Sequence, residues 1–200
     1  MRTLEAMRAL GELDAFGNAL VVSGVGRAAF GASQVWGSRN ITFDSLGSPA
    51  PIALGLRMSL DIEDAPMVVS IEGDGSILFG LESLMSFAGV SPEARHGLVA
   101  IVLDNGMYES AGRMPIKGKP VDWAMLINSF GLPFARSAAT DELESAVQEA
   151  LGGFLILEVV DDDAMPSPDY ANTGSEALVV FREMIQAITG RRLTTPAEKY

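Results

Sequence analysis

The chain has 200 residues, of which 48% are hydrophobic and 20% charged, and this length and composition suit one compact α/β domain. It contains no cysteine, which excludes thiolate metal sites, iron–sulfur clusters, disulfide frameworks and cysteine nucleophiles. Its 14 basic and 26 acidic residues give a net charge of −12, the wrong sign for a protein that binds a nucleic-acid backbone.

Membrane insertion is not expected, because no segment approaches the ~20 apolar residues of a spanning helix. Glu5 also stands where a signal peptide would have its apolar region, so we expect a soluble, cytoplasmic protein. The mean hydropathy of +0.25 is high for such a chain. It suggests that another subunit covers part of the apolar surface.

Val- and Ile-rich runs of strand length alternate with amphipathic helical patterns along the chain. In chain order the predicted elements are strand 19–22, helix 52–60, strand 67–71, helix 78–88, strand 98–103, helices 125–130 and 143–151, strand 154–160 and helix 176–188. Runs that are apolar throughout are typical of parallel strands buried on both faces. The fold class is therefore α/β, with a doubly wound, mostly parallel sheet, helices on both faces and ligands at the carboxyl ends of the strands.

The pattern predicts one domain over residues 1–190, with a surface connection at residues 161–169 and a C-terminal tail over residues 191–200. Within the helix predicted over residues 78–88, core positions are expected for Phe79, Leu84, Met85 and Phe87. His96, the only histidine, is expected to be a solvated loop residue, so a two-histidine metal site is excluded.

Two polar motifs follow successive predicted strands. The first strand ends in Gly73-Asp74-Gly75-Ser76 and passes directly into a helix, which places free backbone N–H groups beside a carboxylate, as a phosphate with a divalent cation requires. The next strand ends in Asp104-Asn105, where a side-chain amide offers an oxygen ligand. Each motif alone could be a turn, but together they favour a site for Mg²⁺, which binds about six oxygens.

These paired motifs resemble the thiamine diphosphate motif of enzymes that depend on this cofactor, and residues 103–110 are most similar to sulfopyruvate and phosphonopyruvate decarboxylases. The resemblance implies the thiamine-diphosphate-binding fold, with both thiamine diphosphate and Mg²⁺ as cofactors. It implies Mg²⁺ ligation by Asp74, Asn105 and the Met107 carbonyl, contacts to the cofactor from Gly73, Gly75, Ser76 and Met107, and an aminopyrimidine turn made by Gly47, Ser48 and Pro49.

The chain departs from the family pattern at three places. Asp104 replaces the usual asparagine, and Pro49 stands where relatives have a bulky apolar wedge that bends the cofactor. Pro49 therefore wedges by its ring alone, or the turn is displaced, or activity is weakened. Residues 111–114 also differ, and the cations Arg113, Lys117 and Lys119 lie near them. They suggest either a mobile loop that meets an anionic substrate or a partner's acidic surface, or else a solvated charged loop.

The resemblance implies a thiamine-diphosphate-dependent lyase that decarboxylates an anionic 2-oxo acid, with carboligation of the acetolactate synthase type as the alternative. It also implies that the activating glutamate comes from a separate pyrimidine-binding α subunit, in a heterodimer or an α2β2 complex. Two other interpretations stay open. Pro49 would suit a degenerate, non-catalytic subunit, and residues 24–29 with Asp44 fit the dinucleotide-binding pattern of an oxidoreductase.

Overall fold

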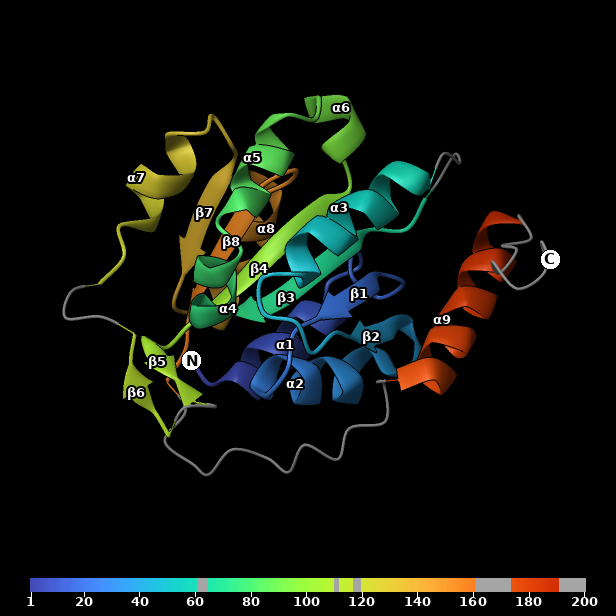
Figure 1. The fold of residues 1–200 in the computed structure, drawn as a ribbon, viewed down its shortest axis with the longest axis horizontal. Coiled ribbons are helices and arrows are strands. Elements are labelled where there is room, and N and C mark those ends of the chain that lie inside the picture. The colour runs from blue at the N-terminus through green and yellow to red at the C-terminus, as the bar shows by residue number, and fades with distance from the viewer. Residues whose placement is uncertain (61–64, 110–111, 117–119, 161–173, 191–200) are drawn as a thin grey trace.

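The computed structural model describes residues 1–60, 65–109, 112–116, 120–160 and 174–190 (Figure 1). Its helices are α1 (Thr3–Glu12), α2 (Arg27–Trp36), α3 (Pro49–Ser59), α4 (Asp74–Phe79), α5 (Glu82–Ala88), α6 (Pro92–Arg95), α7 (Trp123–Asn128), α8 (Leu143–Glu149) and α9 (Gly174–Thr189). Its strands are β1 (Leu20–Ser23), β2 (Asn40–Thr42), β3 (Val68–Gly73), β4 (Leu98–Asp104), β5 (Met107–Tyr108), β6 (Met114–Pro115), β7 (Phe134–Ser137) and β8 (Phe154–Glu158).

Six strands form one sheet in the order β2-β1-β3-β4-β8-β7, and every neighbouring pair in it is parallel. The remaining strands, β5 and β6, form a small antiparallel hairpin after β4. Strand β2 lies on one side of β1, whereas β3 lies on the other side, so the direction of winding reverses between β1 and β3. A crevice for ligands opens at such a reversal, outside the carboxyl ends of the strands.

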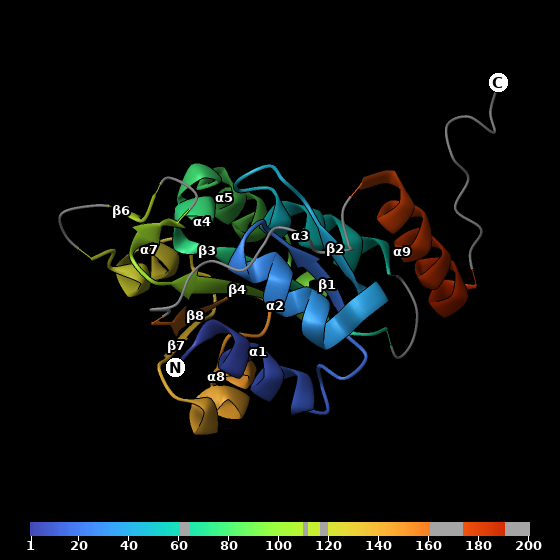
Figure 2. The same ribbon diagram turned by 90° about the horizontal axis from the view of Figure 1, so that it is seen from below.

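Helices cover both faces of the sheet, and the strands alternate their apolar side chains between them (Figures 1 and 2). Val21 and Ile71 pack with α1, α2 and α8 on one face, whereas Val22 and Val68 pack with α3, α5, α7 and α9 on the other. The predicted α/β fold class is confirmed. No helix within the described residues has the length and apolarity that a membrane crossing requires.

The prediction of one continuous helix over residues 78–88 is wrong. The segment is broken into α4 and α5 at Gly80 and Leu81, where Gly80 packs directly against the backbone of Gly47. Leu84 and Phe87 are in the core as expected, but Phe79 and Met85 are 65% and 66% exposed, so their predicted core positions are wrong. Phe79 is the last residue of α4 and Met85 lies within α5, and both side chains are exposed to solvent.

Candidate functional site

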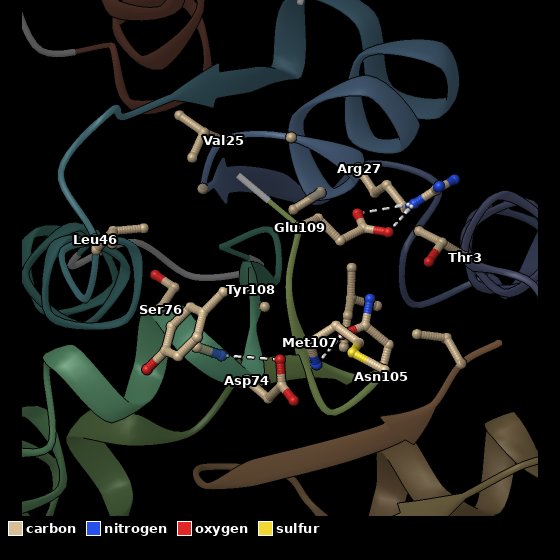
Figure 3. Close-up of a pocket in the computed structure, with 17 residues that line it drawn as sticks. Thr3, Val25, Arg27, Leu46, Asp74, Ser76, Asn105, Met107, Tyr108 and Glu109 are labelled. Atoms are coloured by element: carbon tan, nitrogen blue, oxygen red, sulfur yellow. Dashed lines mark hydrogen bonds and ion pairs between the residues drawn. The ribbon is translucent and has the colours of Figure 1, made fainter. Parts of the chain in front are cut away.

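A pocket lies at the crevice between β1 and β3, where three connections meet (Figure 3). Residues 24–28 follow β1 and residues 73–76 follow β3. The third wall comes from the segment after β4, and Thr3, Leu46, Leu103 and Val159 complete the lining. The lining residues of that third wall are Asn105, Met107, Tyr108 and Glu109. The two polar motifs of the sequence thus face one pocket, because their strands are neighbours in the sheet.

Asp74 joins the two motifs. It is the first residue of α4 and is 1% exposed. Its Oδ1 accepts a hydrogen bond from the Gly75 amide at 2.9 Å, and its Oδ2 accepts one from the Gly106 amide at 2.8 Å. Burial, together with the neighbouring Asp104 carboxyl, raises the pKa of Asp74 to about 7. Two interacting carboxyls repel each other when both are ionised, and a cation beside them would relieve that repulsion.

The segment after β4 offers further oxygen atoms. The Oδ1 atom of Asn105 accepts from the Met107 amide at 2.9 Å, which closes a tight turn beside Asp74. A carboxylate has about four acceptor positions and an amide oxygen two, so Asp74 and Asn105 both keep free lone pairs. Asp104 accepts a hydrogen bond from the Trp123 indole at 2.7 Å, which fixes its carboxyl toward α7.

This donor set fits Mg²⁺. Within the described residues no three His, Cys, Asp or Glu side chains gather closely enough to hold a metal ion by themselves. A cation beside Asp74 would therefore need amide, carbonyl and non-protein oxygens to complete its shell. Mg²⁺ is commonly bound in this way, by one or two carboxylates together with phosphate oxygens and water.

Gly75 and Tyr108 form the wall beside Asp74. A side chain at position 75 would collide with the Tyr108 ring, so only glycine fits under it. The Tyr108 ring also meets Phe79 edge to face, with 6.3 Å between the ring centroids. Tyr108 thereby links the pocket to the exposed face of α4.

An ion pair that joins the connection after β1 to the segment after β4 was not predicted from the sequence. The Nε atom of Arg27, the first residue of α2, lies 2.9 Å from a Glu109 carboxylate oxygen, and the side chains are 8% and 10% exposed. Both residues line the pocket (Figure 3). Since 82 residues separate them in the chain, no local pattern could have paired them.

Glu72 is the other residue that sequence reasoning missed. It lies in β3 directly before the Gly73–Ser76 motif and is 1% exposed. Burial raises its pKa to about 7, although hydrogen bonds from Ser76 and Ala50 oppose that shift. A single acid inside an apolar strand was the signal that could have identified it.

The turn at residues 46–50 lies beside the pocket, but only Leu46 lines it. Gly47 and Ser48 lead into α3, and Pro49 is the first residue of that helix. The missing N–H of Pro49 costs nothing there, because the first amides of a helix have no partner within it. A side chain at position 24 would contact the Pro49 ring, which shows that Pro49 packs beside Gly24 at the end of β1.

Of the three predicted cationic residues, only Arg113 lies within the described part of the chain. Arg113 is exposed, has a positive φ of 63° and does not line the pocket. Lys117, Lys119 and the connection predicted at residues 161–169 lie outside the described residues, as does the tail at residues 191–200. His96 is exposed in the loop after α6, as predicted.

Comparison with known proteins finds similarity to decarboxylases. The chain is 32% identical over 115 residues to the sulfopyruvate decarboxylase subunit beta of Methanocaldococcus jannaschii, matching 56% of this chain and 58% of that protein. It is 33% identical over 108 residues to the phosphonopyruvate decarboxylase of Streptomyces viridochromogenes, matching 54% of this chain but 25% of that protein. The chain thus spans only part of these relatives.

A solved structure gives the same fold. A putative thiamin diphosphate-dependent enzyme from Mycobacterium smegmatis superposes with a TM-score of 0.61 at 22% identity, over 80% of this chain and 31% of that one. The family model described as "Thiamine pyrophosphate enzyme, C-terminal TPP binding domain" matches residues 24–159. Because this match spans more than half of the chain and includes both motifs, the protein belongs to the thiamine pyrophosphate enzyme family.

Proposed function

We propose that this chain is the diphosphate-binding β subunit of a heteromeric thiamine-diphosphate- and Mg²⁺-dependent enzyme that decarboxylates an anionic 2-oxo acid. The observation that carries the proposal is the buried Asp74, which stands between the Gly75 and Gly106 amides with Asn105 at the same edge of the sheet. The decarboxylases among its relatives support the choice of reaction.

Asp74, Asn105 and the Met107 carbonyl would hold Mg²⁺, and the metal would in turn anchor the diphosphate. A diphosphate beside an ionised Asp74 would be repelled without such a cation. Gly73, Gly75 and Ser76 would border the diphosphate, while the turn at residues 47–49 would lie toward the aminopyrimidine. When bound, thiamine diphosphate supplies a nucleophilic carbon and an electron sink for the loss of CO₂ from a 2-oxo acid.

This chain would anchor the cofactor and exclude water from one side of it, while a separate pyrimidine-binding subunit would supply the activating glutamate. An apolar surface beside the pocket suits contact with that subunit. It consists of the exposed side chains of Leu46, Phe79, Leu81 and Met85. Leu46 also lines the pocket, and Phe79 contacts Tyr108, so a partner seated on this surface would close the site.

Carboligation is the alternative reaction, because the chemistry up to the loss of CO₂ is shared with decarboxylation. The non-catalytic alternative rests on Pro49, yet a proline at the first position of α3 is compatible with an ordinary helix start. The family match favours the thiamine interpretation over the dinucleotide one, because it covers residues 24–29 together with both polar motifs.

The proposal is tested by titrating the full chain with thiamine diphosphate, once with Mg²⁺ and once with a chelator, and by native mass spectrometry of the complex isolated in Mg²⁺ buffer. We expect Mg²⁺-dependent binding and a heteromer that carries the cofactor mass. A homo-oligomer that binds a nicotinamide or flavin dinucleotide instead would overturn the proposal. Adding 2-oxo acids to the isolated complex then separates decarboxylation, which releases an aldehyde, from carboligation.

A further inference from the structure

Glu72 is a buried carboxyl to which the metal and diphosphate contacts described above assign no task. It is 1% exposed in a strand whose other residues are mostly apolar. Burying a carboxyl is costly unless hydrogen bonds compensate. Two do so here: Glu72 Oε2 accepts from the Ser76 hydroxyl at 2.5 Å, and Oε1 accepts from the Ala50 amide at 3.2 Å. The carboxyl therefore bridges the start of α4 and the start of α3.

Ser76 extends this bridge in one direction. Its Oγ donates its only proton to Glu72 and accepts a hydrogen bond from the Gly47 amide at 2.9 Å. Donation therefore runs from Gly47 to Ser76 and from Ser76 to Glu72. While this arrangement holds, the Ser76 hydroxyl has no proton left to donate to a phosphate. Its side chain serves the turn at residues 46–50, although Ser76 also lines the pocket (Figure 3).

A backbone contact fixes the same turn from the other side. Gly47 has a positive φ of 76°, and a side chain on either Gly47 or Gly80 would collide with the backbone of the other residue. The turn is thus pressed against the end of α4 and hydrogen bonded to its first turn. Its position relative to residues 73–76 is defined by three hydrogen bonds and one backbone contact.

We propose that Glu72 is a positioning residue that, through Ser76 and Ala50, fixes the turn at residues 46–50 relative to the loop at residues 73–76. The identity of the ligand rests on the proposed function: these two segments face the aminopyrimidine and the diphosphate ends of one cofactor. Glu72 sets the spacing between them without touching either end. A glutamine replaces the carboxylate only in part. With its oxygen toward the Ala50 amide, its NH2 group must donate to Ser76, which reverses that hydrogen bond, and in the opposite orientation the NH2 group faces the Ala50 N–H.

Hydrogen exchange in the full chain without ligand tests the positioning role. In Glu72→Gln and Ser76→Ala we expect the amides of residues 46–48 and of Ala50 to exchange roughly tenfold faster, while those of β3 and β4 stay protected. Ser70→Ala is the matched control, because Ser70 is a buried hydroxyl of the same strand with no hydrogen-bond partner in the described part of the structure. Unchanged exchange in the turn, or equal acceleration in β3 and β4, would overturn the proposal.

A second measurement compares two ligands in the presence of Mg²⁺. Calorimetry of Glu72→Gln should show roughly tenfold weaker binding of thiamine diphosphate and unchanged binding of inorganic pyrophosphate, which occupies only the diphosphate end. Equal weakening of both ligands would place Glu72 in the diphosphate loop alone and refute the spacing role. A wild-type chain that binds neither ligand would contradict the proposed function, and hydrogen exchange would then decide the role of Glu72 independently.

Discussion

The two glycine-containing connections that line the pocket differ in charge. Residues 24–27 follow β1 and residues 73–76 follow β3, and both lead from a strand into a helix at the reversal of the sheet. The first brings Arg27, which is neutralised by Glu109. The second brings the buried Asp74, whose carboxyl interacts with that of Asp104. The glycine spacing is the same, but the backbones differ: α2 begins after Gly26, which has a positive φ of 75°, whereas α4 begins directly after Gly73, which has a φ of −75°. Only the second connection therefore starts its helix with a buried carboxylate that can hold a cation.

The largest effect, on cofactor binding, is expected when the Asp74 carboxylate of the second connection is removed. Asp74→Ala should weaken Mg²⁺-dependent binding of thiamine diphosphate roughly 100-fold or more, because the buried carboxylate ligand is lost. Calorimetry with and without a chelator measures this, and hydrogen exchange verifies the fold. Asp44→Ala is the control, since Asp44 is exposed and does not line the pocket. A larger loss of binding in Asp44→Ala would revive the dinucleotide interpretation.

The second connection should also make stability depend on pH. The pKa of Glu72 is raised from 4.5 to about 7, so the folded chain binds this proton more tightly than the unfolded chain does. The associated stabilisation is complete below about pH 4.5 and is lost as the pH rises through about 7, a change of roughly 3 kcal/mol. Asp74 acts in the same direction. Urea unfolding with a chelator at pH 5 and pH 8 should show a smaller difference for Glu72→Gln. An equal difference in both proteins would contradict the assignment.

The first connection should respond to loss of its ion pair. Glu109→Gln should destabilise the fold by about 2 kcal/mol, because it leaves the Arg27 guanidinium buried without its carboxylate. Arg27→Met combined with Glu109→Gln should cost less than the sum of the two single substitutions. Chemical unfolding of all four proteins gives this coupling. Strict additivity would mean that the pair adds nothing to the connection.

The sequence predicted the central strands because their apolar runs are long and both faces are buried, as in β3 and β4. It did not predict the edge strands β2 and β7, which are short and mix polar with apolar residues; Arg136 of β7, for example, is exposed. The motif at residues 73–76 was visible because its parts are adjacent. The contacts of Glu72 with Ala50 and of Arg27 with Glu109 depend on the packing of distant segments.

The smallest effect on stability is expected at the turn of residues 46–50, which contacts both connections. Pro49 packs at the end of β1, near Gly24, and begins α3. Pro49→Met should change the free energy of unfolding by less than about 1 kcal/mol, because the first position of a helix tolerates proline without requiring it. Pro92→Met is the matched control, since Pro92 begins α6 outside the pocket lining. If a longer apolar side chain at position 49 supports the cofactor better, turnover of the isolated complex should be kept or raised in Pro49→Met and unchanged in Pro92→Met. A large loss of turnover confined to Pro49→Met would show instead that the ring of proline, packed beside Gly24 of the first connection, sets a cofactor geometry of its own.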